Sequence, residues 1–190
     1  SFSQHPSAAA LLRKKGVFLD RDGTINPDPG YISSLEDFSF YNYTISSLKK
    51  MAEAGNRFCI LTNQSGIARG LIQQNDLDEI HTFIKSEFER HKIPLLGIYV
   101  CPDHPEQASE RRKPGPGMFL EAELDHDLNL MECIMIGDSV ADMEAGEMLG
   151  MDTMLVLSGR GSETMDFLPE YEMPTFIVQD LAEGALKICQ

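Results

Sequence analysis

The sequence has few cysteines, few basic side chains and no long apolar run. Sixteen lysine and arginine residues stand against 30 aspartate and glutamate residues among 190, which gives a formal net charge of −14. A protein that binds nucleic acid by neutralising its phosphates needs the opposite balance, so we expect no nucleic-acid partner. No apolar run approaches the ~18 residues of a membrane-spanning helix, so we expect no membrane partner either.

The four cysteines, Cys59, Cys101, Cys133 and Cys189, are too few and too scattered for a disulfide framework. Three of them lie in or at the end of short apolar runs, which is typical of buried free thiols in a reducing compartment. The first 15 residues hold a short apolar patch followed by three basic residues, whereas a secretory signal has its charges first. We interpret them as a flexible arm and predict a cytoplasmic protein.

Short apolar runs alternate with longer helical patterns along the rest of the chain. Buried strands are predicted at residues 16–20, 57–62, 97–101, 133–137 and 153–157, with a short sixth strand at 175–178. Helical spacing occupies residues 44–54, 74–91, 116–127, 142–149 and 181–188. This alternation predicts a single α/β domain over residues 16–190, with a doubly wound, Rossmann-like parallel sheet flanked by helices. In such folds the functional site lies at the carboxyl ends of the strands.

Aspartates follow two of the predicted strands. Asp20 and Asp22 come after the first strand, and Asp138 comes after the fourth. Carboxylates this close repel each other unless a cation lies between them or one is protonated. A divalent ion with oxygen ligands relieves that repulsion, and Mg²⁺ is the usual choice when phosphate is another ligand. Each aspartate alone is equally well explained as a cap of a helix or turn, but three at strand ends favour a magnesium site.

Thr62 and Lys113 fit the remaining needs of phosphoryl transfer. A hydroxyl and a fixed ammonium neutralise the equatorial oxygens of the phosphoryl group while the attacking and leaving oxygens stay in line. Gly23 and Gly66 allow the backbone to approach a phosphate closely. A lone Lys-Pro pair is weak support, because most lysines are solvated surface charges, and it gains weight only from the motifs around it.

Taken in order, four motifs resemble those of the haloacid dehalogenase (HAD) superfamily. They are Asp20-x-Asp22-x-Thr24, the strand-end Thr62, Lys113-Pro114, and Gly137-Asp138-Ser139-x-x-Asp142. The longer stretches 18–26, 62–70 and 101–114 are similar to the branch of histidinol phosphatases and heptose-bisphosphate phosphatases. The resemblance implies a HAD-type fold and a Mg²⁺-dependent phosphatase that acts on a small sugar bisphosphate through an aspartyl-phosphate.

The resemblance also implies a role for each matching position. Asp20 would be the nucleophile and Asp22 the general acid and base, while Thr62 and Lys113 would stabilise the transferring phosphoryl group. Asp20, Asp138 and the backbone carbonyl of Asp22 would hold Mg²⁺. The positions at which this branch contacts its substrate are Asp28, Pro29, Gly30, Tyr31, Asn63, Gln64, Ser65 and Arg112.

The chain departs from this branch at two places. Its members commonly carry a zinc loop of pattern Cys-x-His…Cys-x-Cys before Arg-Lys-Pro. Here Cys101 remains, but Asp103, Ser109 and Arg111 occupy the other three positions, so we predict no structural zinc. Ser139 stands where heptose enzymes often have a lysine near the substrate, and we count it among the substrate-side positions.

The gaps between elements are too short for a folded cap domain. About nineteen residues separate Thr24 from the first helix and about eleven separate Cys101 from Lys113. We therefore expect an open site for a small phosphorylated metabolite, with selectivity supplied by loops at 26–42, 63–72 and 102–112. The oligomeric state expected is a monomer or a small homo-oligomer.

Three alternative functions stay open at this point. A histidinol-phosphate phosphatase shares all the motifs. A polynucleotide 3′-phosphatase shares the chemistry, but the chain lacks a basic stripe for nucleic acid. A catalytically silent binding module would retain the fold alone.

Three histidines and one arginine lie outside the four motifs. His81, His91 and His126 lie on helical patterns and are predicted to be surface residues. Arg69 has two interpretations: it anchors a distal phosphate, or it pairs with one of the many acids.

Overall fold

The computed structural model describes residues 16–190, so the predicted arm lies outside the described residues. Six parallel strands form one sheet in the order β3-β2-β1-β4-β5-β6. The strands are β1 (Gly16–Leu19), β2 (Arg57–Asn63), β3 (Leu95–Cys101), β4 (Ile134–Gly137), β5 (Asp152–Val156) and β6 (Phe176–Val178). The chain first winds outward from β1 to β3 and then returns to the other side of β1, which confirms the doubly wound sheet. A crevice opens at such a reversal, here at the carboxyl ends of β1 and β4.

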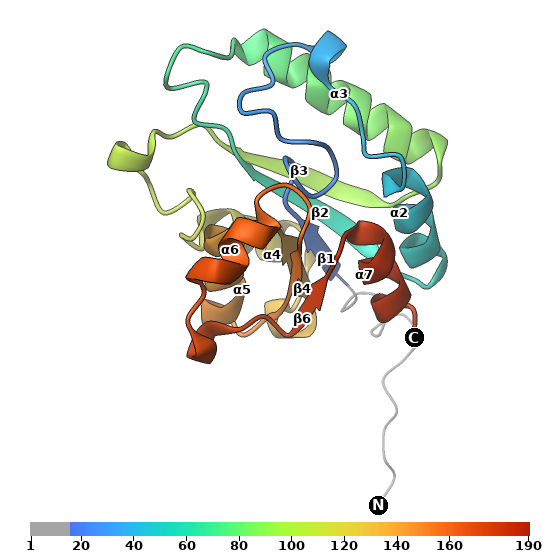
Figure 1. Cartoon of the computed structure of the whole chain (residues 1–190). Coiled ribbons are helices and arrows are strands. Elements are labelled where there is room, and N and C mark those ends of the chain that lie inside the picture. Colours follow the sequence, from blue (N-terminus) through green and yellow to red (C-terminus); the bar gives the residue numbers. More distant parts are fainter. Residues whose placement is uncertain (1–15) are drawn as a thin grey trace, which may run out of the picture.

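Helices cover both faces of the sheet (Figure 1). They are α2 (Thr44–Glu53), α3 (Gln74–Arg90), α4 (Gly117–His126), α5 (Val140–Met148), α6 (Gly161–Phe167) and α7 (Leu181–Ile188). Because successive side chains of a strand point to opposite faces, each strand serves two cores. Val17 and Leu19 pack with residues of α2, α3 and α7, whereas Phe18 packs with residues of α4 and α5.

The six strands and five of the helices lie where the sequence predicts them, with small shifts at their ends. The helix predicted from residue 142 begins at Val140, because Ser139 caps it. Helix α6 is missed altogether. Its seven residues, GSETMDF, include only two large apolar side chains, too few to show a helical period.

No large cap domain is inserted beside the site. Between β1 and α2 the only regular element is a 3-10 turn at Leu35–Asp37, and between β3 and α4 it is another at Pro105–Gln107. The expectation of an open site is therefore confirmed for the described residues. None of the helices within residues 16–190 is long and apolar enough to cross a membrane. All four cysteines are free thiols, with Cys59, Cys101 and Cys133 buried as predicted.

Candidate active site

A pocket of about 440 Å³ lies at the carboxyl edge of the sheet. The predicted residues that line it are Asp20, Asp22, Asp28, Gly30, Tyr31, Thr62, Asn63, Gln64, Ser65, Arg112, Lys113, Asp138 and Ser139. Pro29 is exposed and is not among the lining residues. Arg69, Pro105, Ala141 and Arg160 complete the wall. Residues from six separate stretches of the chain are thus brought together.

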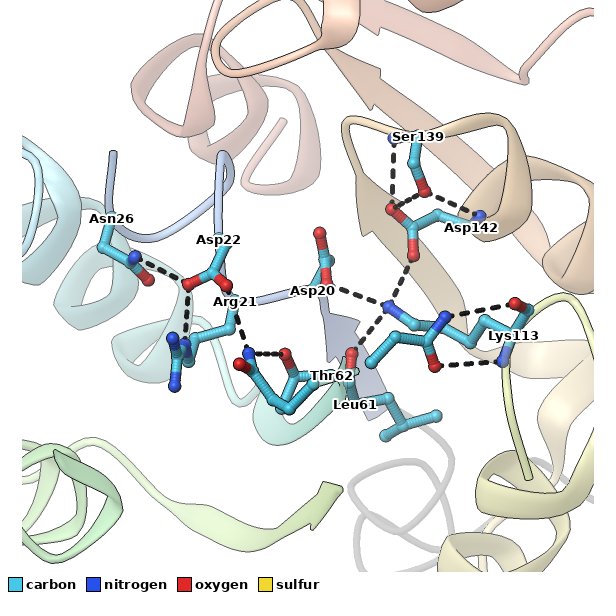
Figure 2. Close-up of polar contacts among 11 residues, drawn as sticks. Asp20, Arg21, Asp22, Asn26, Leu61, Thr62, Lys113, Ser139 and Asp142 are labelled. Atoms are coloured by element: carbon cyan, nitrogen blue, oxygen red, sulfur yellow. Dashed lines mark hydrogen bonds and ion pairs between the residues drawn. The ribbon is translucent and has the colours of Figure 1, made fainter. Parts of the chain in front are cut away.

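The ammonium of Lys113 lies at the floor of the pocket and is only 4% exposed. Its Nζ donates to Asp20 Oδ1 at 2.9 Å, to Asp142 Oδ1 at 2.6 Å and to the Leu61 carbonyl at 2.7 Å (Figure 2). Burial by itself would lower the pKa of Lys113, but the carboxylates of Asp142 and Asp20 outweigh it and raise that pKa. Lys113 is therefore a fixed positive charge beside Asp20.

Asp142 orients Lys113, a role that the sequence did not reveal. One of its oxygens accepts from Lys113, and the other accepts from the backbone N–H and hydroxyl of Ser139 at 3.1 and 2.8 Å. The hydroxyl of Ser139 in turn accepts from the backbone N–H of Asp142, which completes a capping box at the start of α5. The Ser-x-x-Asp spacing was the available signal for this box.

Asp20 and Asp138 form a pair of facing carboxylates. Oxygens of Asp20, Asp138 and Asp142 all lie within 4.8 Å of one another. Burial, together with the charge of Asp142, raises the pKa of Asp20 and raises that of Asp138 to about 6. Because Asp142 already serves Lys113 and Ser139, the carboxylates left to hold a cation are Asp20 and Asp138. An all-oxygen donor set of this kind fits Mg²⁺.

The backbone beside Asp138 is shaped by two glycines. Gly23 has a φ of +85°, and a Cβ there would fall 2.0 Å from Asp138 Oδ2. Gly159 has a φ of +55°, and its Cβ would fall 2.4 Å from the same oxygen. The backbone N–H of Arg160 donates to that oxygen at 2.8 Å. The carboxylate is therefore enclosed by backbone that only glycine permits.

Asp22 accepts hydrogen bonds from three side chains. Its Oδ1 accepts from Arg21 Nε at 2.7 Å and from Asn26 Nδ2 at 3.0 Å. Its Oδ2 accepts from Gln64 Nε2 at 3.1 Å, and the same amide nitrogen donates to Thr62 Oγ1 at 2.8 Å. Gln64, predicted as a substrate contact, thus also links two of the predicted catalytic residues.

His81 is not a surface residue, so that prediction is wrong. It is 7% exposed, and its Nε2 lies 3.1 Å from NH1 of Arg21. Burial, aided by the charge of Arg21, lowers the pKa of His81 to about 3. The signal was present in the sequence, because Leu77, Ile80, His81 and Ile84 share the buried face of α3.

Three arginines are among the residues that line the pocket. Arg69 lies with its Nε 3.4 Å from Ser65 Oγ, and Arg112 donates to the Asp103 carbonyl at 3.2 Å. The side chain of Arg160 is 68% exposed, and its Nε lies 3.6 Å from Asp28 Oδ2. The position of Arg69 in the pocket wall favours the phosphate-anchoring interpretation. Arg160 escaped prediction because it lies in the loop before the missed helix α6.

The loop between Cys101 and Lys113 is held by hydrogen bonds among the residues that replace the zinc ligands. The backbone N–H of Ser109 donates to Asp103 Oδ2 at 2.8 Å, and the Ser109 hydroxyl donates to the same oxygen. Arg111 donates to the Val100 carbonyl at 2.6 Å and pairs with Glu121. The positive charge of Arg111 therefore lies where this pattern would need a thiolate.

Comparisons with known proteins place the chain among relatives of known family. A family model described as HAD-hydrolase-like matches residues 110–184. The D-glycero-alpha-D-manno-heptose-1,7-bisphosphate 7-phosphatase of Burkholderia mallei is 35% identical over 156 residues, which cover 78% of this chain and 82% of the relative. The D-glycero-beta-D-manno-heptose-1,7-bisphosphate 7-phosphatase of Helicobacter pylori is 41% identical over 133 residues, covering 70% of this chain and 77% of the relative.

A solved structure gives the same result. The D,D-heptose 1,7-bisphosphate phosphatase from B. bronchiseptica, crystallised with magnesium and phosphate, superposes with a TM-score of 0.83 at 30% identity. The similarity covers 92% of this chain and 97% of the other.

Proposed function

The chain belongs to the HAD-like phosphatases, and from that premise we propose that it hydrolyses the 7-phosphate of D-glycero-D-manno-heptose 1,7-bisphosphate. The observation that carries the proposal is the division of the pocket into two zones for anions. Thr62 and Lys113 are buried and form the floor, where Lys113 contacts Asp20, whereas Arg69 and Arg160 are exposed and Arg112 is half-buried, so these three form the wall. A bisphosphate has a phosphate for each zone.

The predicted roles account for both halves of the reaction. An oxygen of Asp20 attacks phosphorus while the bond from phosphorus to the sugar oxygen breaks, and Asp22 gives that oxygen a proton. Water then attacks the aspartyl-phosphate, Asp22 takes a proton from the water, and the bond from phosphorus to Asp20 breaks. Asp20 is thereby regenerated and inorganic phosphate leaves.

The surrounding residues neutralise charge during both steps. Lys113 and the Thr62 hydroxyl donate to the equatorial oxygens of the phosphoryl group, where negative charge concentrates. Asp20, Asp138 and the backbone carbonyl of Asp22 would hold Mg²⁺. When bound, the ion would supply positive charge that offsets the negative charge of the phosphoryl group.

The alternative functions fit the pocket less well. Histidinol phosphate carries a cationic amine where the bisphosphate carries a second phosphate, and three arginines in the wall repel a cation. An oligonucleotide brings many phosphates to a chain with a net charge of −14. A catalytically silent binding module would not explain why Lys113 is held between two buried carboxylates.

The proposal is tested by phosphate release in the presence of Mg²⁺. Heptose 1,7-bisphosphate, histidinol phosphate and a 3′-phosphorylated oligonucleotide are compared, with the position of the remaining phosphate read by NMR. We expect the bisphosphate to give the highest kcat/KM, with the 1-phosphate retained and all turnover lost in EDTA. A higher kcat/KM for either competitor would overturn the substrate, and no turnover of any ester, including p-nitrophenyl phosphate, would overturn the activity.

Three further properties of the chain are proposed. All six strands share one sheet, which supports a single domain over residues 16–190. Free thiols support a cytoplasmic location. The oligomeric state proposed is a monomer or a small homo-oligomer, and sedimentation would distinguish the two.

A further inference from the structure

Arg21 is a buried charge that the mechanism above does not use. It lies between Asp20 and Asp22 in the sequence, yet its side chain is fully buried. Burying a guanidinium costs free energy unless its donors find partners. Here Nε donates to Asp22 Oδ1 at 2.7 Å, NH1 lies 3.1 Å from His81 Nε2, and the guanidinium carbon lies 5.7 Å from the centre of the Phe38 ring.

These contacts hold the guanidinium in one orientation. A guanidinium can only donate, so the Nε2 of His81 must be an unprotonated acceptor. His81 belongs to α3, and Phe38 belongs to the loop before α2, so the two clamp Arg21 from separate elements. In this orientation the Nε–H of Arg21 points toward Asp22, as Figure 2 shows.

The two oxygens of Asp22 therefore differ. Oδ1 accepts from a fixed cation and from Asn26, which occupies it fully. Oδ2 accepts only from the neutral amide of Gln64, a bond that a substrate oxygen or water can replace. Both lone pairs of Oδ1 are thus engaged by side chains of the protein, so Oδ2 is the oxygen that can exchange a proton with the substrate or with water.

We propose that Arg21, held by His81, is a positioning residue that locks Oδ1 of Asp22, so that Oδ2 makes both proton transfers. In the first step the proton moves from Oδ2 to the sugar oxygen as the bond from phosphorus to that oxygen breaks. In the second step a proton of the attacking water moves to Oδ2 as the bond from phosphorus to Asp20 breaks. This inference rests on the proposed function, because it takes Asp22 as the acid and base.

Two substrates can distinguish this positioning role from a merely structural one. Their leaving groups differ in whether they must be protonated in order to leave. A sugar alkoxide leaves only with a proton, whereas p-nitrophenolate leaves without one. In Arg21→Met we expect kcat on the sugar bisphosphate to fall about 100-fold, the usual range for a lost acid or base. The pre-steady-state burst of p-nitrophenolate should slow less than about 3-fold, because that step needs no acid. Steady-state turnover after the burst should fall, because water activation still needs the base.

Two His81 variants and a matched control complete the design. His81→Leu removes the acceptor and should reproduce the pattern of Arg21→Met, whereas His81→Gln keeps a neutral acceptor and should restore most of the turnover. Asn56→Ala is the control, because Asn56 is a buried polar residue just before β2, at the end of that strand away from the pocket, and its amide donates to the Met51 carbonyl. It should leave the ratio of the two rates unchanged, and melting temperatures of all variants report folding.

Equal loss of the burst and of sugar turnover in Arg21→Met, or loss of neither, would overturn the inference. If Arg21→Met does not fold, the comparison of His81→Leu with His81→Gln decides by the same ratio. If the wild type prefers another alkyl phosphate, only the assignment of the substrate is overturned. The ratio of ester turnover to the p-nitrophenolate burst is then measured on that ester. A wild-type chain inactive on every ester overturns the proposed function and this inference with it.

Discussion

Single residues decide the charge balance of this site. Lys113 is the one cation placed between Asp20 and Asp142, at 2.9 and 2.6 Å. Truncating one member of such a buried cluster leaves both an uncompensated charge and a cavity, whereas a residue of similar shape leaves only the uncompensated charge. A variant within this cluster must therefore be shown to be folded before its activity is interpreted.

Asp20→Asn should abolish turnover while leaving the protein folded. The amide keeps an oxygen that can accept from Lys113, but it cannot form an aspartyl-phosphate, so kcat should fall by several orders of magnitude. Phosphate release with Mg²⁺ is the measurement, and Asp152→Asn, an exposed aspartate at the opposite end of β5, is the control. Fluoroberyllate with Mg²⁺ should bind the wild type as an aspartyl-phosphate mimic and should fail to bind Asp20→Asn. Near wild-type release by the variant would falsify the nucleophile assignment.

Lys113 and Arg112 are adjacent but should act on different parts of the substrate. Lys113 is proposed to contact the phosphoryl group being transferred, so Lys113→Ala should depress kcat on every ester. Arg112 lines the wall and bonds the Asp103 carbonyl, so Arg112→Ala should raise KM for the bisphosphate more than it lowers kcat. Steady-state kinetics on the bisphosphate and on p-nitrophenyl phosphate test the split. Equal losses of kcat on the aryl ester would contradict it.

Arg160 should recognise the second phosphate of the bisphosphate. Its backbone N–H is held by Asp138, so the exposed side chain starts at a fixed point in the pocket wall. Arg160→Ala keeps that N–H and should raise KM for the bisphosphate about tenfold, the value of one lost ion pair to phosphate. KM of this variant for p-nitrophenyl phosphate should stay within about twofold of the wild-type value. The control is Arg90→Ala, a surface change remote from the pocket, which should leave KM for both esters within the same range. A parallel rise for both esters in Arg160→Ala would rule out this role.

The strand-end rule was enough to assemble Asp20, Asp22, Thr62 and Asp138 from the sequence, because the carboxyl ends of parallel strands meet at one edge. Lys113 lies on no strand and was found through its motif. The partnership of Arg21 with His81 could not be predicted, because it depends on how α3 packs against the turn after β1. That packing is a tertiary property, and no local pattern around Arg21 encodes it.

At the scale of elements, the start of α5 shows how a helix boundary and the chemistry depend on each other. Asp142 closes the capping box with Ser139 and uses its other oxygen for Lys113. The apolar pattern alone placed the helix start two residues late, since the capping residues are polar and carry no periodic signal. Fixing Asp142 at the first turn of α5 in turn fixes the ammonium at the pocket floor.

The loop that replaces the zinc pattern should hold no structural metal. A closed zinc site needs four ligands, and here Asp103 and Ser109 bond each other while Arg111 brings a positive charge. Elemental analysis of protein purified without added metal should find well below one zinc per chain, and Cys101→Ala should change neither that value nor the order of residues 101–112. The prediction would be wrong if the wild type contained nearly one zinc per chain and if Cys101→Ala lost both that zinc and the order of the loop.

At the scale of the whole molecule, an acidic chain must bind an acidic substrate. The formal charge of −14 is spread over the surface, while arginines concentrate at the pocket wall. The local field at the pocket then differs from the average field of the chain, and screening by salt weakens the long-range repulsion more than the short-range attraction. Selection of a small bisphosphate therefore depends on a few placed cations rather than on net charge.

The buried His81 should make the stability of the whole fold sensitive to acid. Its pKa is about 3 in the folded protein against 6.5 for an unperturbed histidine, so unfolding takes up a proton below pH 6.5. The stability that neutral His81 contributes is thus fully present above pH 6.5 and is lost as the pH falls toward 3. From these two values, the free energy of unfolding should drop by about 2 kcal/mol between pH 7.5 and 5. Asp20 and Asp138, whose pKa values are raised, change stability in the opposite direction, so the wild type must be compared with a variant.

His81→Gln isolates the contribution of the histidine, because glutamine keeps a neutral acceptor for Arg21 but does not titrate. Urea unfolding of metal-free protein at pH 7.5 and pH 5 gives the loss of stability for each protein. The wild type should lose about 2 kcal/mol more than His81→Gln over this interval, since the carboxylates titrate alike in both. An equal loss in the two proteins would mean that His81 takes up its proton in the folded state, and the bond from Arg21 to a neutral His81 would then have to be abandoned.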